Sequence, residues 1–396
     1  MTPLERRTVS SLALLYSFRM LGLFMVLPLL ALYAADLPGA DPLTIGLALG
    51  VYGLSQALLQ IPLGWLSDKL GRKPVIVGGL LVFALGSVVA GMAETIEGVV
   101  LGRALQGAGA IASTVMALVA DLTREEQRTK AMAIVGMNIG LSFAMALVLG
   151  PLVAAAGGLS AVFWFTTVLA IVGVAIVLLL VPTPPVGQMY DEVGARRGLF
   201  ARSLQDAGLL RLNFAVFSLH FVLMALFLVV PGLLLEVADL DRNSHWMVYL
   251  PALLLSIVGM VPMMIMAERK GRLHAMFLLA IVLLILAMTV ISAPASPVLL
   301  YLGMWLFFVG FNYLEATLPS LVSKMVFAGG KGTALGVYST CQFLGAFAGG
   351  ALGGWLLKSG GASLLLGCCL VLSALWLVVF LPTSSLLGAP AAARGE

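Results

Sequence analysis

The chain has 396 residues, of which 61% are hydrophobic and only 10% are charged, and its mean hydropathy is +1.10. Soluble globular domains contain about 45–50% apolar and about 25% charged residues, so this composition excludes a water-soluble protein. The net charge of +4 comes from 22 basic and 18 acidic residues that cluster in short gaps between apolar runs, which indicates that lipid is the solvent.

The apolar runs are long enough to cross a bilayer, because about 20 apolar residues span its hydrocarbon core. They are continuous and do not alternate as the strands of a membrane barrel do. We therefore predict an all-α integral membrane protein with twelve transmembrane helices. The predicted spans cover residues 10–34, 43–67, 74–93, 98–120, 130–155, 159–181, 209–235, 245–267, 273–292, 297–322, 332–357 and 362–381.

The distribution of lysine and arginine predicts which side of the membrane each loop faces. Placing both termini inside assigns almost every basic loop residue to the cytoplasm and leaves only Arg242 and Lys358 outside. Cytoplasmic loops carry an excess of these residues, so we predict that both termini are cytoplasmic. The richness in arginine and the short N-terminal tail favour the inner membrane of a bacterium. The positive net charge then reflects topology, and we expect no binding of nucleic acid.

Two segments that follow the second and eighth predicted spans align without a gap. The sequence from Ile61 is IPLGWLSDKLGR, and the sequence from Val261 is VPMMIMAERKGR. This repeat predicts an N-terminal six-helix bundle over residues 1–181, a cytoplasmic linker over 182–208 and a C-terminal six-helix bundle over 209–396. Parallel repeats of this kind are typical of transporters, which bind substrate near the bilayer midplane between the halves.

The loop after the second span carries a specific motif, because Gly64, Asp68, Gly71, Arg72 and Lys73 form the pattern G-x-x-x-D-x-x-G-R-K. This pattern resembles the signature of the major facilitator superfamily, and the resemblance covers nearly the whole chain. It implies a fold of two six-helix bundles. Gly71 permits a tight turn, and the two charged side chains can pair with neighbouring helix ends and hold the cytoplasmic side closed.

The same gating network is predicted to include further charged loop residues. Asp121 ends the fourth span and Arg128 begins the fifth, and they are similar in position to partners of the motif. In the second half of the chain, Glu268, Gly271 and Arg272 occupy the positions that correspond to the acid, the glycine and the arginine of the first motif.

Two helical motifs extend the resemblance. Arg103 and Gln106 begin the sequence R-x-x-Q-G-x-G, which resembles a pattern of proton-coupled members in which the arginine is linked to proton transfer. Gly150 and Pro151 match the core of the antiporter motif, although Ala146 stands where a glycine is usual. Segments of the first and fourth spans also resemble the YajR-like group of drug:proton antiporter-type exporters.

Four ionisable residues lie well inside predicted spans: Arg19, Arg103, His220 and Glu315. Ionisable residues in a membrane are costly and mark functional sites by default, and in the family fold these helices line the central cavity. Polar residues at helical spacing are further candidates for this cavity. They are Tyr16, Tyr52, Gln56, Gln106, Asn138, Asn312, Tyr338 and Gln342. The alternative is that these residues form hydrogen bonds between helices and do not touch substrate.

Glu315 is the only carboxylate placed deep in the membrane, so we hypothesise that it takes a proton from the periplasmic side and releases it inward. His220 is the alternative carrier, because an unperturbed histidine titrates at about pH 6.5. It can also be a hydrogen-bonded core residue. With Glu315 ionised and His220 neutral the deep residues sum to +1, which favours an anionic, zwitterionic or neutral amphiphile over a cationic drug.

These observations predict a secondary active transporter that exports a small amphiphile in exchange for protons. We find no H-E-x-x-H motif and no G-x-x-x-x-G-K-[ST] loop, so we expect no enzyme activity, no metal and no cofactor, and the proton gradient as the energy source. The expected partners are the lipid bilayer, protons and the substrate, and we expect a monomer. A proton-coupled importer of a small nutrient and a non-transporting membrane scaffold remain alternatives.

Overall fold

The computed structural model describes residues 1–182, 200–326 and 331–383. Within these ranges the chain is helical and contains no strand. It divides into two compact units, Met1–Asp191 (unit 1) and Glu192–Glu396 (unit 2). Most of the predicted linker lies outside the described residues, and residues 200–205 at its end are helical.

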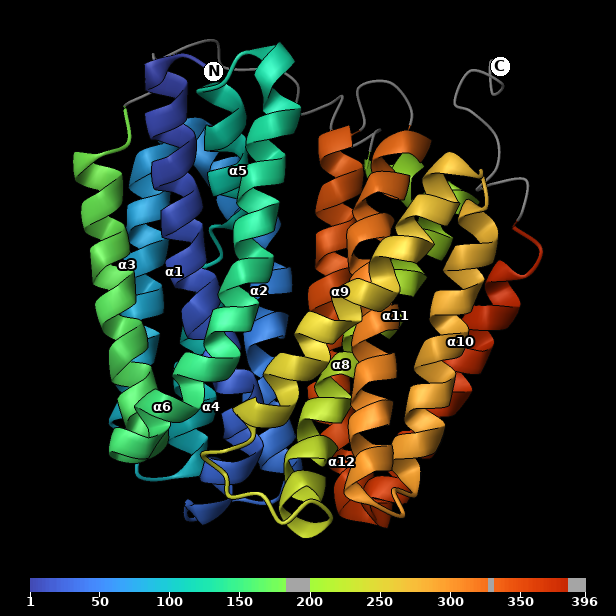
Figure 1. Cartoon of the computed structure of the whole chain (residues 1–396). Coiled ribbons are helices and arrows are strands. Elements are labelled where there is room, and N and C mark those ends of the chain that lie inside the picture. Colours follow the sequence, from blue (N-terminus) through green and yellow to red (C-terminus); the bar gives the residue numbers. More distant parts are fainter. Residues whose placement is uncertain (183–199, 327–330, 384–396) are drawn as a thin grey trace. The chain divides into compact units, whose positions relative to one another are not determined.

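Unit 1 contains six α-helices and one short 3-10 helix in the described part of the chain (Figure 1). Its elements are α1 (Pro3–Tyr33), η1 (Ala34–Asp36), α2 (Pro42–Leu70), α3 (Arg72–Gly91), α4 (Ile96–Ala108), α5 (Ala112–Asp121) and α6 (Glu125–Leu179). Helix α1 packs along α6, and α4 packs against both α2 and α3. The predicted span 98–120 is therefore divided, because the helix is interrupted at residues 109–111, between α4 and α5.

Five long helices make up most of unit 2 in the part of the chain that the structure describes. They are α8 (Ala207–Glu236), α9 (Trp246–Arg269), α10 (Leu273–Ser292), α11 (Pro297–Met325) and α12 (Lys331–Phe380). Helix α8 packs along α12, and α11 packs against α9 and α10. Several starts follow capping rules: Asp206 and Ser296 each accept a hydrogen bond from the third backbone N–H of the helix that they precede.

Ten helical segments within the described residues are long and apolar enough to cross a membrane, with α4 and α5 counted together as one segment, Ile96–Asp121. Two of them, α6 with 55 residues and α12 with 50, are far longer than the roughly 20 residues that one crossing needs. Each is interrupted by a glycine pair with non-helical backbone angles, Gly157 with Gly158 and Gly360 with Gly361. The predicted pairs of spans 130–155 with 159–181 and 332–357 with 362–381 thus each lie in one continuous element that contains a kink.

Glycines let two helix pairs approach closely where the polar residues lie. A Cβ atom on Gly86 of α3 would collide with the backbone of Gln106 on α4. In unit 2, Cβ atoms on Gly345 and Gly349 of α12 would lie 2.8 Å and 2.7 Å from the Cα atoms of Phe217 and Phe221 on α8. Small residues at such contacts are typical of helix packing in lipid.

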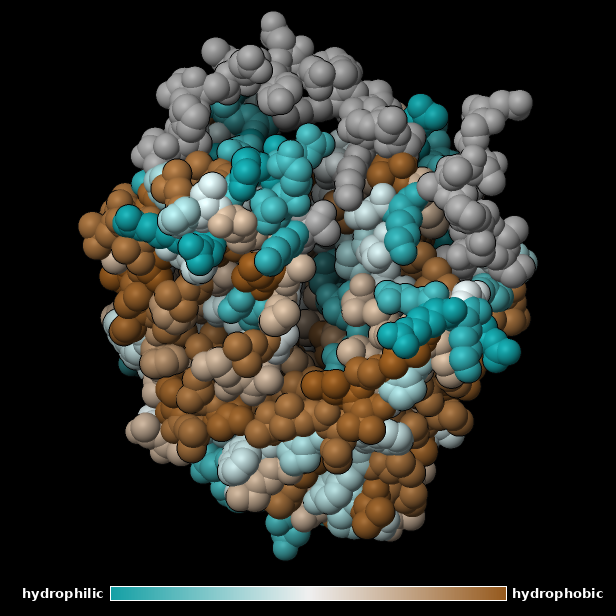
Figure 2. Space-filling view, turned by 45° about the horizontal axis from the view of Figure 1, so that its top comes forward, coloured by the Kyte–Doolittle hydropathy of each residue, from teal (hydrophilic) through white to brown (hydrophobic). Residues whose placement is uncertain are grey.

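The outer surface agrees with a membrane environment. Large apolar side chains such as Leu58, Met137, Leu179, Val258 and Val371 are exposed. Figure 2 shows that hydrophobic side chains cover broad continuous areas of the surface, whereas hydrophilic ones gather mainly in the upper part of the view and at its lower end. Apolar surface of this extent suits contact with lipid acyl chains, because soluble proteins rarely expose large contiguous apolar patches.

Candidate functional site

Unit 2 brings three predicted residues from three helices into one polar cluster. His220 lies on α8, Glu315 on α11 and Gln342 on α12. Nε2 of Gln342 lies 2.8 Å from Nε2 of His220 and 3.4 Å from Oε1 of Glu315. Nε2 of His220 is also 3.8 Å from Oε2 of Glu315. The close approach of α8 and α12 at their glycine contacts places the amide within reach of the imidazole.

The hydrogen bonds define the tautomer of His220. Its Nδ1 lies 3.1 Å from the carbonyl oxygen of Val216, which can only accept, so Nδ1 carries the proton in the neutral ring. Nε2 then accepts a hydrogen bond, and the amide of Gln342 donates it. The same amide nitrogen also donates to the carboxylate of Glu315. Gln342 therefore bridges the two titratable groups while His220 is neutral.

Glu315 keeps one oxygen available for a proton. Its Oε2 is buried and accepts no hydrogen bond within the described residues, although 38% of the side chain as a whole is exposed. The hydroxyl of Tyr338 is also buried and without a hydrogen-bond partner in the described part of the chain. One helical turn before Glu315, Asn312 donates to Ser256 on α9 at 2.7 Å.

A second polar cluster lies in unit 1 around Tyr52 of α2. Nη2 of Arg19, on α1, donates to the hydroxyl of Tyr52 at 2.8 Å and to Oε1 of Gln56 at 2.7 Å. The guanidinium carbon of Arg103, on α4, lies 4.9 Å from the centre of the Tyr52 ring. Both arginines are buried, with 2% and 0% of their surface exposed, and Tyr16, one turn before Arg19, is buried as well.

Arg103 is held by neutral groups. Its Nη1 donates to Oε1 of Gln106 at 2.8 Å, and its Nε donates to the carbonyl oxygen of Ala48 at 3.2 Å. Gln106 in turn donates to the hydroxyl of Ser87 on α3 at 2.7 Å. Within the described residues, no carboxylate lies within ion-pair distance of Arg103 or Arg19, so the cluster carries two buried positive charges.

Several charged residues of the predicted gating network contact one another at the turn between α2 and α3. Arg72 forms ion pairs with Asp68 and, at 2.9 Å, with Asp121 at the end of α5. It also donates to the hydroxyl of Ser67 at 2.8 Å. Gly71 has a φ of +91°, which a residue with a side chain rarely adopts. The charged residues of the motif thus connect α2, α3 and α5.

The other basic residues of this region bind backbone carbonyl oxygens. Lys73 donates to Val181 at 2.8 Å, and Arg128 donates to Ala120 at 3.2 Å. Asp121, which was expected in the same network, is paired with Arg72.

These features agree with the comparisons with known proteins. The sequence profile described as Major Facilitator Superfamily matches residues 12–350. The chain is 48% identical over 382 residues to the inner membrane transport protein YajR of Escherichia coli, covering 96% of this chain and 84% of that protein. The chain belongs to the major facilitator superfamily. It is therefore a transport protein of a membrane and not an enzyme.

More distant relatives of this superfamily member include the multidrug resistance protein MdtH of Klebsiella pneumoniae. The two are 26% identical over 352 residues, which cover 86% of this chain and 84% of the relative. Among solved structures, the nucleoside transporter NupG is similar with a TM-score of 0.74 at 16% identity, covering 96% of this chain and 99% of NupG. At that identity the similarity concerns the fold alone.

The remaining predicted residues lie apart from the two clusters. Asn138 accepts a hydrogen bond from Ser17 of α1 at 3.3 Å and so links α6 to α1. At Gly150, which precedes Pro151 within α6, a Cβ atom would lie 3.3 Å from the carbonyl oxygen of Met25, so this residue permits close packing on α1. In unit 2 the loop residues of the second motif are exposed: Glu268, Gly271 and Arg272.

The sequence interpretation missed an ion pair at the start of this superfamily member. Glu5 accepts hydrogen bonds from Arg124 at 2.9 Å and 3.2 Å, and the pairing raises the pKa of Arg124. Glu5 also closes a capping box with Thr2. The T-x-x-E spacing could have predicted the capping box, but no sequence pattern indicates Arg124 as the long-range partner of Glu5.

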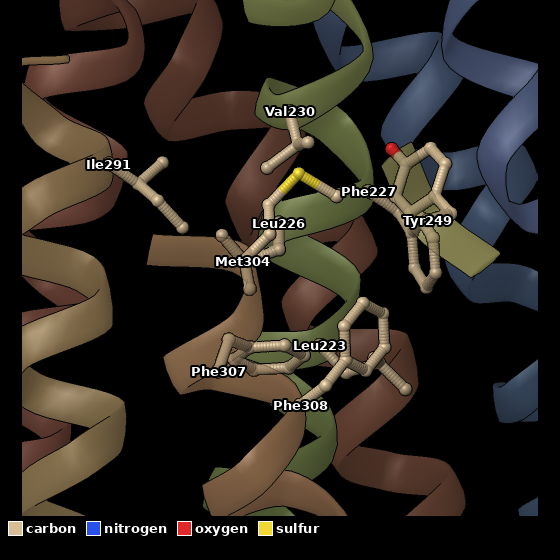
Figure 3. Close-up of a pocket in the computed structure, with 9 residues that line it drawn as sticks. All are labelled: Leu223, Leu226, Phe227, Val230, Tyr249, Ile291, Met304, Phe307 and Phe308. Carbon is tan, nitrogen blue, oxygen red and sulfur yellow. The ribbon is translucent and has the colours of Figure 1, made fainter. Parts of the chain in front are cut away.

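An apolar cavity in unit 2 was also not predicted. It lies among α8, α9, α10 and α11, as Figure 3 shows, and contains none of the predicted cavity residues. Its lining consists of Leu223, Leu226, Phe227, Val230, Tyr249, Ile291, Met304, Phe307 and Phe308.

Proposed function

We propose that this protein is a proton-coupled exporter that exchanges protons for a small amphiphilic molecule by alternating access. The observation that carries the proposal is the bridge from His220 through Gln342 to Glu315. It joins two groups that can hold a proton, and it joins three helices that must move if the protein changes conformation. The relative named a multidrug resistance protein supports export.

A proton that enters this cluster changes its contacts. In the neutral state, Nε2 of His220 accepts a hydrogen bond from Gln342. Once protonated, Nε2 becomes a donor and can no longer face the amide NH₂ group, whereas the carboxylate of Glu315 becomes its preferred partner. Protonation of His220 therefore replaces a contact between α8 and α12 with one between α8 and α11. Protonation of Glu315 instead removes the charge that Gln342 and His220 face.

The direction of coupling follows from charge. We propose that the protonated cluster favours one access state and the deprotonated cluster favours the other, so that proton entry from the periplasm drives release of substrate outward. The ion pairs of Arg72 with Asp68 and Asp121 stabilise the state that is closed to the cytoplasm. Breaking them opens that side.

We also propose that the chain crosses the inner membrane of a bacterium twelve times with both termini in the cytoplasm. The glycine pairs inside α6 and α12 support two crossings for each of these elements, because each half on its own is long enough to span. We expect a monomer in the bilayer that needs no metal or cofactor. Reporter fusions after Pro182 and at the C-terminus test the topology, and a periplasmic signal from either would contradict it.

Proton movement in proteoliposomes that contain the purified protein tests coupling. We expect chemically diverse amphiphiles to elicit proton flux, and Glu315→Gln to abolish it. His220→Ala serves as the second variant. The matched control is Glu236→Gln, which removes an exposed carboxylate at the end of α8 in the same unit. Unchanged flux with an unchanged pH dependence in both cluster variants would refute the proposed proton site.

The alternative is a proton-coupled importer. It is favoured by the fifth predicted span, in which Ala146 and Ala154 are buried at positions where the antiporter pattern usually has glycine. The same assay separates the two functions, because protons and substrate move in opposite directions during exchange and in the same direction during import.

A further inference from the structure

We propose that the cluster around Tyr52 in unit 1 is an anion-binding site that takes the acidic group of the transported molecule. The inference builds on the proposed transport function and specifies its substrate class: a compact anionic group of the carboxylate type on an organic body. The cluster consists of Arg19 on α1, Tyr52 and Gln56 on α2, and Arg103 on α4.

The first argument is the unbalanced charge. Arg19 and Arg103 are almost fully buried, and both guanidinium groups contact Tyr52. Every aspartate and glutamate within residues 1–182 lies in a loop or in a terminal turn of a helix, and none of them forms an ion pair with either arginine. The aromatic rings of Tyr52 and Phe83 stabilise the cations only in part, because they are neutral. Intramembrane cations pair with opposite charges or with backbone carbonyls, and the neutral acceptors around Arg19 and Arg103 leave the two positive charges uncompensated.

The second argument is a set of unused hydrogen-bond donors. Nε of Arg19, Nε2 of Gln56 and Nη2 of Arg103 are buried and have no hydrogen-bond partner within the described residues. A buried donor without an acceptor costs the desolvation free energy of the group, and the cost is larger when the group is charged. Three such donors from three helices are present around one tyrosine. A carboxylate offers about four lone-pair sites and accepts bidentate bonds from arginine, so it matches this set.

The third argument concerns access. The unused donors are shut off from solvent in this conformation. An anion therefore reaches them only when the helices around the cluster move, and a transporter that alternates between access states undergoes such helix movements. A cationic molecule is repelled by the two guanidinium groups, and a neutral acceptor can bind the donors but leaves both charges uncompensated. The cluster therefore selects substrates by charge.

Binding to the purified full-length protein in detergent tests the proposal without a proton gradient. Thermal unfolding is measured at constant sodium concentration while sodium benzoate replaces sodium gluconate, and benzamide and benzylamine serve as neutral and cationic isosteres. We expect a saturable rise of the unfolding midpoint with benzoate alone. Arg19→Gln and Arg103→Gln should raise the half-saturating benzoate concentration by about tenfold or more, since each removes a charge-assisted donor.

Two variants control for charge and folding. Arg6→Gln removes the same charge from an exposed position on α1 and should leave benzoate binding unchanged. Arg19→Lys keeps the charge and should restore binding to within about threefold of the native protein, although it loses the fork geometry. If Arg103→Gln does not fold, Arg19→Gln with its lysine counterpart still decides the question.

The source of the anion is separated by chloride and sulfate titrations. If chloride or sulfate gives the same arginine-dependent stabilisation and displaces benzoate with an affinity higher than that of benzoate itself, the site holds a free inorganic anion. The proposal is overturned if benzoate stabilises both arginine variants as much as the native protein, or if no tested anion gives a saturable effect. If Glu315→Gln loses proton coupling but still binds benzoate, the proton site in unit 2 and the anion site in unit 1 can be tested independently of each other.

Discussion

The side-chain amide of Gln342 donates to the imidazole of His220 across 2.8 Å. The relationship is possible only because α8 and α12 approach each other at glycines. The imidazole accepts this bond because its other nitrogen is committed to the carbonyl oxygen of Val216. The hydrogen bond from Gln342 on α12 thus depends on the protonation state of His220 on α8. The same amide also donates to Glu315.

Gln342→Leu should uncouple the two titratable groups without changing either. The substitution keeps most of the side-chain volume but removes the bridging donor, so His220 and Glu315 interact only directly. We expect proton flux in proteoliposomes to fall by about tenfold and its pH profile to shift, because loss of one bridging hydrogen bond of about 1.5 kcal/mol changes an equilibrium by about that factor.

The control for this substitution is Thr340→Val on the same helix. Thr340 bonds only locally, to the carbonyl oxygen of Gly336 at 3.0 Å, so its loss should leave the pH profile unchanged. A profile for Gln342→Leu that overlies the native one would show that Gln342 packs there without positioning the proton site. A shift of the same size in Thr340→Val would point to a general disturbance of α12.

Much of this architecture could be predicted from the sequence because lipid imposes a strong pattern. Long apolar runs, the repeated motif and the intramembrane charges identify a helical transporter, and the deep residues His220 and Glu315 do meet in the structure. The interruption at residues 109–111 was not predictable, because the hydropathy of the run does not change there. Hydropathy measures burial in lipid and carries little information on backbone angles.

The exact pairing of charges across the fold was the other gap. Asp121 and Arg128 were both expected in the network of the loop motif, and in the structure Asp121 pairs with Arg72 whereas Arg128 donates to the carbonyl oxygen of Ala120. Both arginines lie near the same helix end, so charge alone cannot distinguish them. The choice depends on the direction in which α3 leaves the turn at Gly71, and that direction is set by packing that a single sequence does not encode locally.

The pair of Arg72 with Asp121 should contribute little to global stability while still linking helices. The side chains are 19% and 41% exposed, so solvent screens the interaction and we expect a coupling free energy of about 0.2–1 kcal/mol. A double-mutant cycle of Arg72→Gln and Asp121→Asn, read by thermal unfolding in detergent, measures it. The coupling should decrease as salt concentration increases.

A parallel cycle with Lys69→Gln provides the matched control. Lys69 carries the same charge three positions before Arg72, but its ammonium lies over the ring of Trp65. We expect Lys69→Gln and Asp121→Asn to be additive within about 0.3–0.5 kcal/mol. Equal coupling free energies in both cycles would mean that Asp121 interacts with the overall positive charge of the loop and not specifically with Arg72.

Replacing a glycine of α12 by alanine should raise or lower the stability of the protein, depending on whether that glycine contacts α8. Alanine is more favourable than glycine in a helix interior by about 0.5–1 kcal/mol, so a glycine without a packing role should gain stability when replaced. Gly336 of α12 meets nothing within 4 Å of its added Cβ, and Gly336→Ala should therefore raise the unfolding midpoint.

Gly349→Ala should do the opposite on the same helix. Its Cβ would lie 2.7 Å from the Cα of Phe221, and backbone atoms cannot move aside as a flexible side chain can. We expect a loss of about 1–3 kcal/mol from overpacking. Separation of α8 from α12 would also lengthen the bond between Gln342 and His220, so proton flux should fall in Gly349→Ala and persist in Gly336→Ala. Equal midpoints and equal flux in the two variants would contradict the glycine contact as the feature that holds the proton site together.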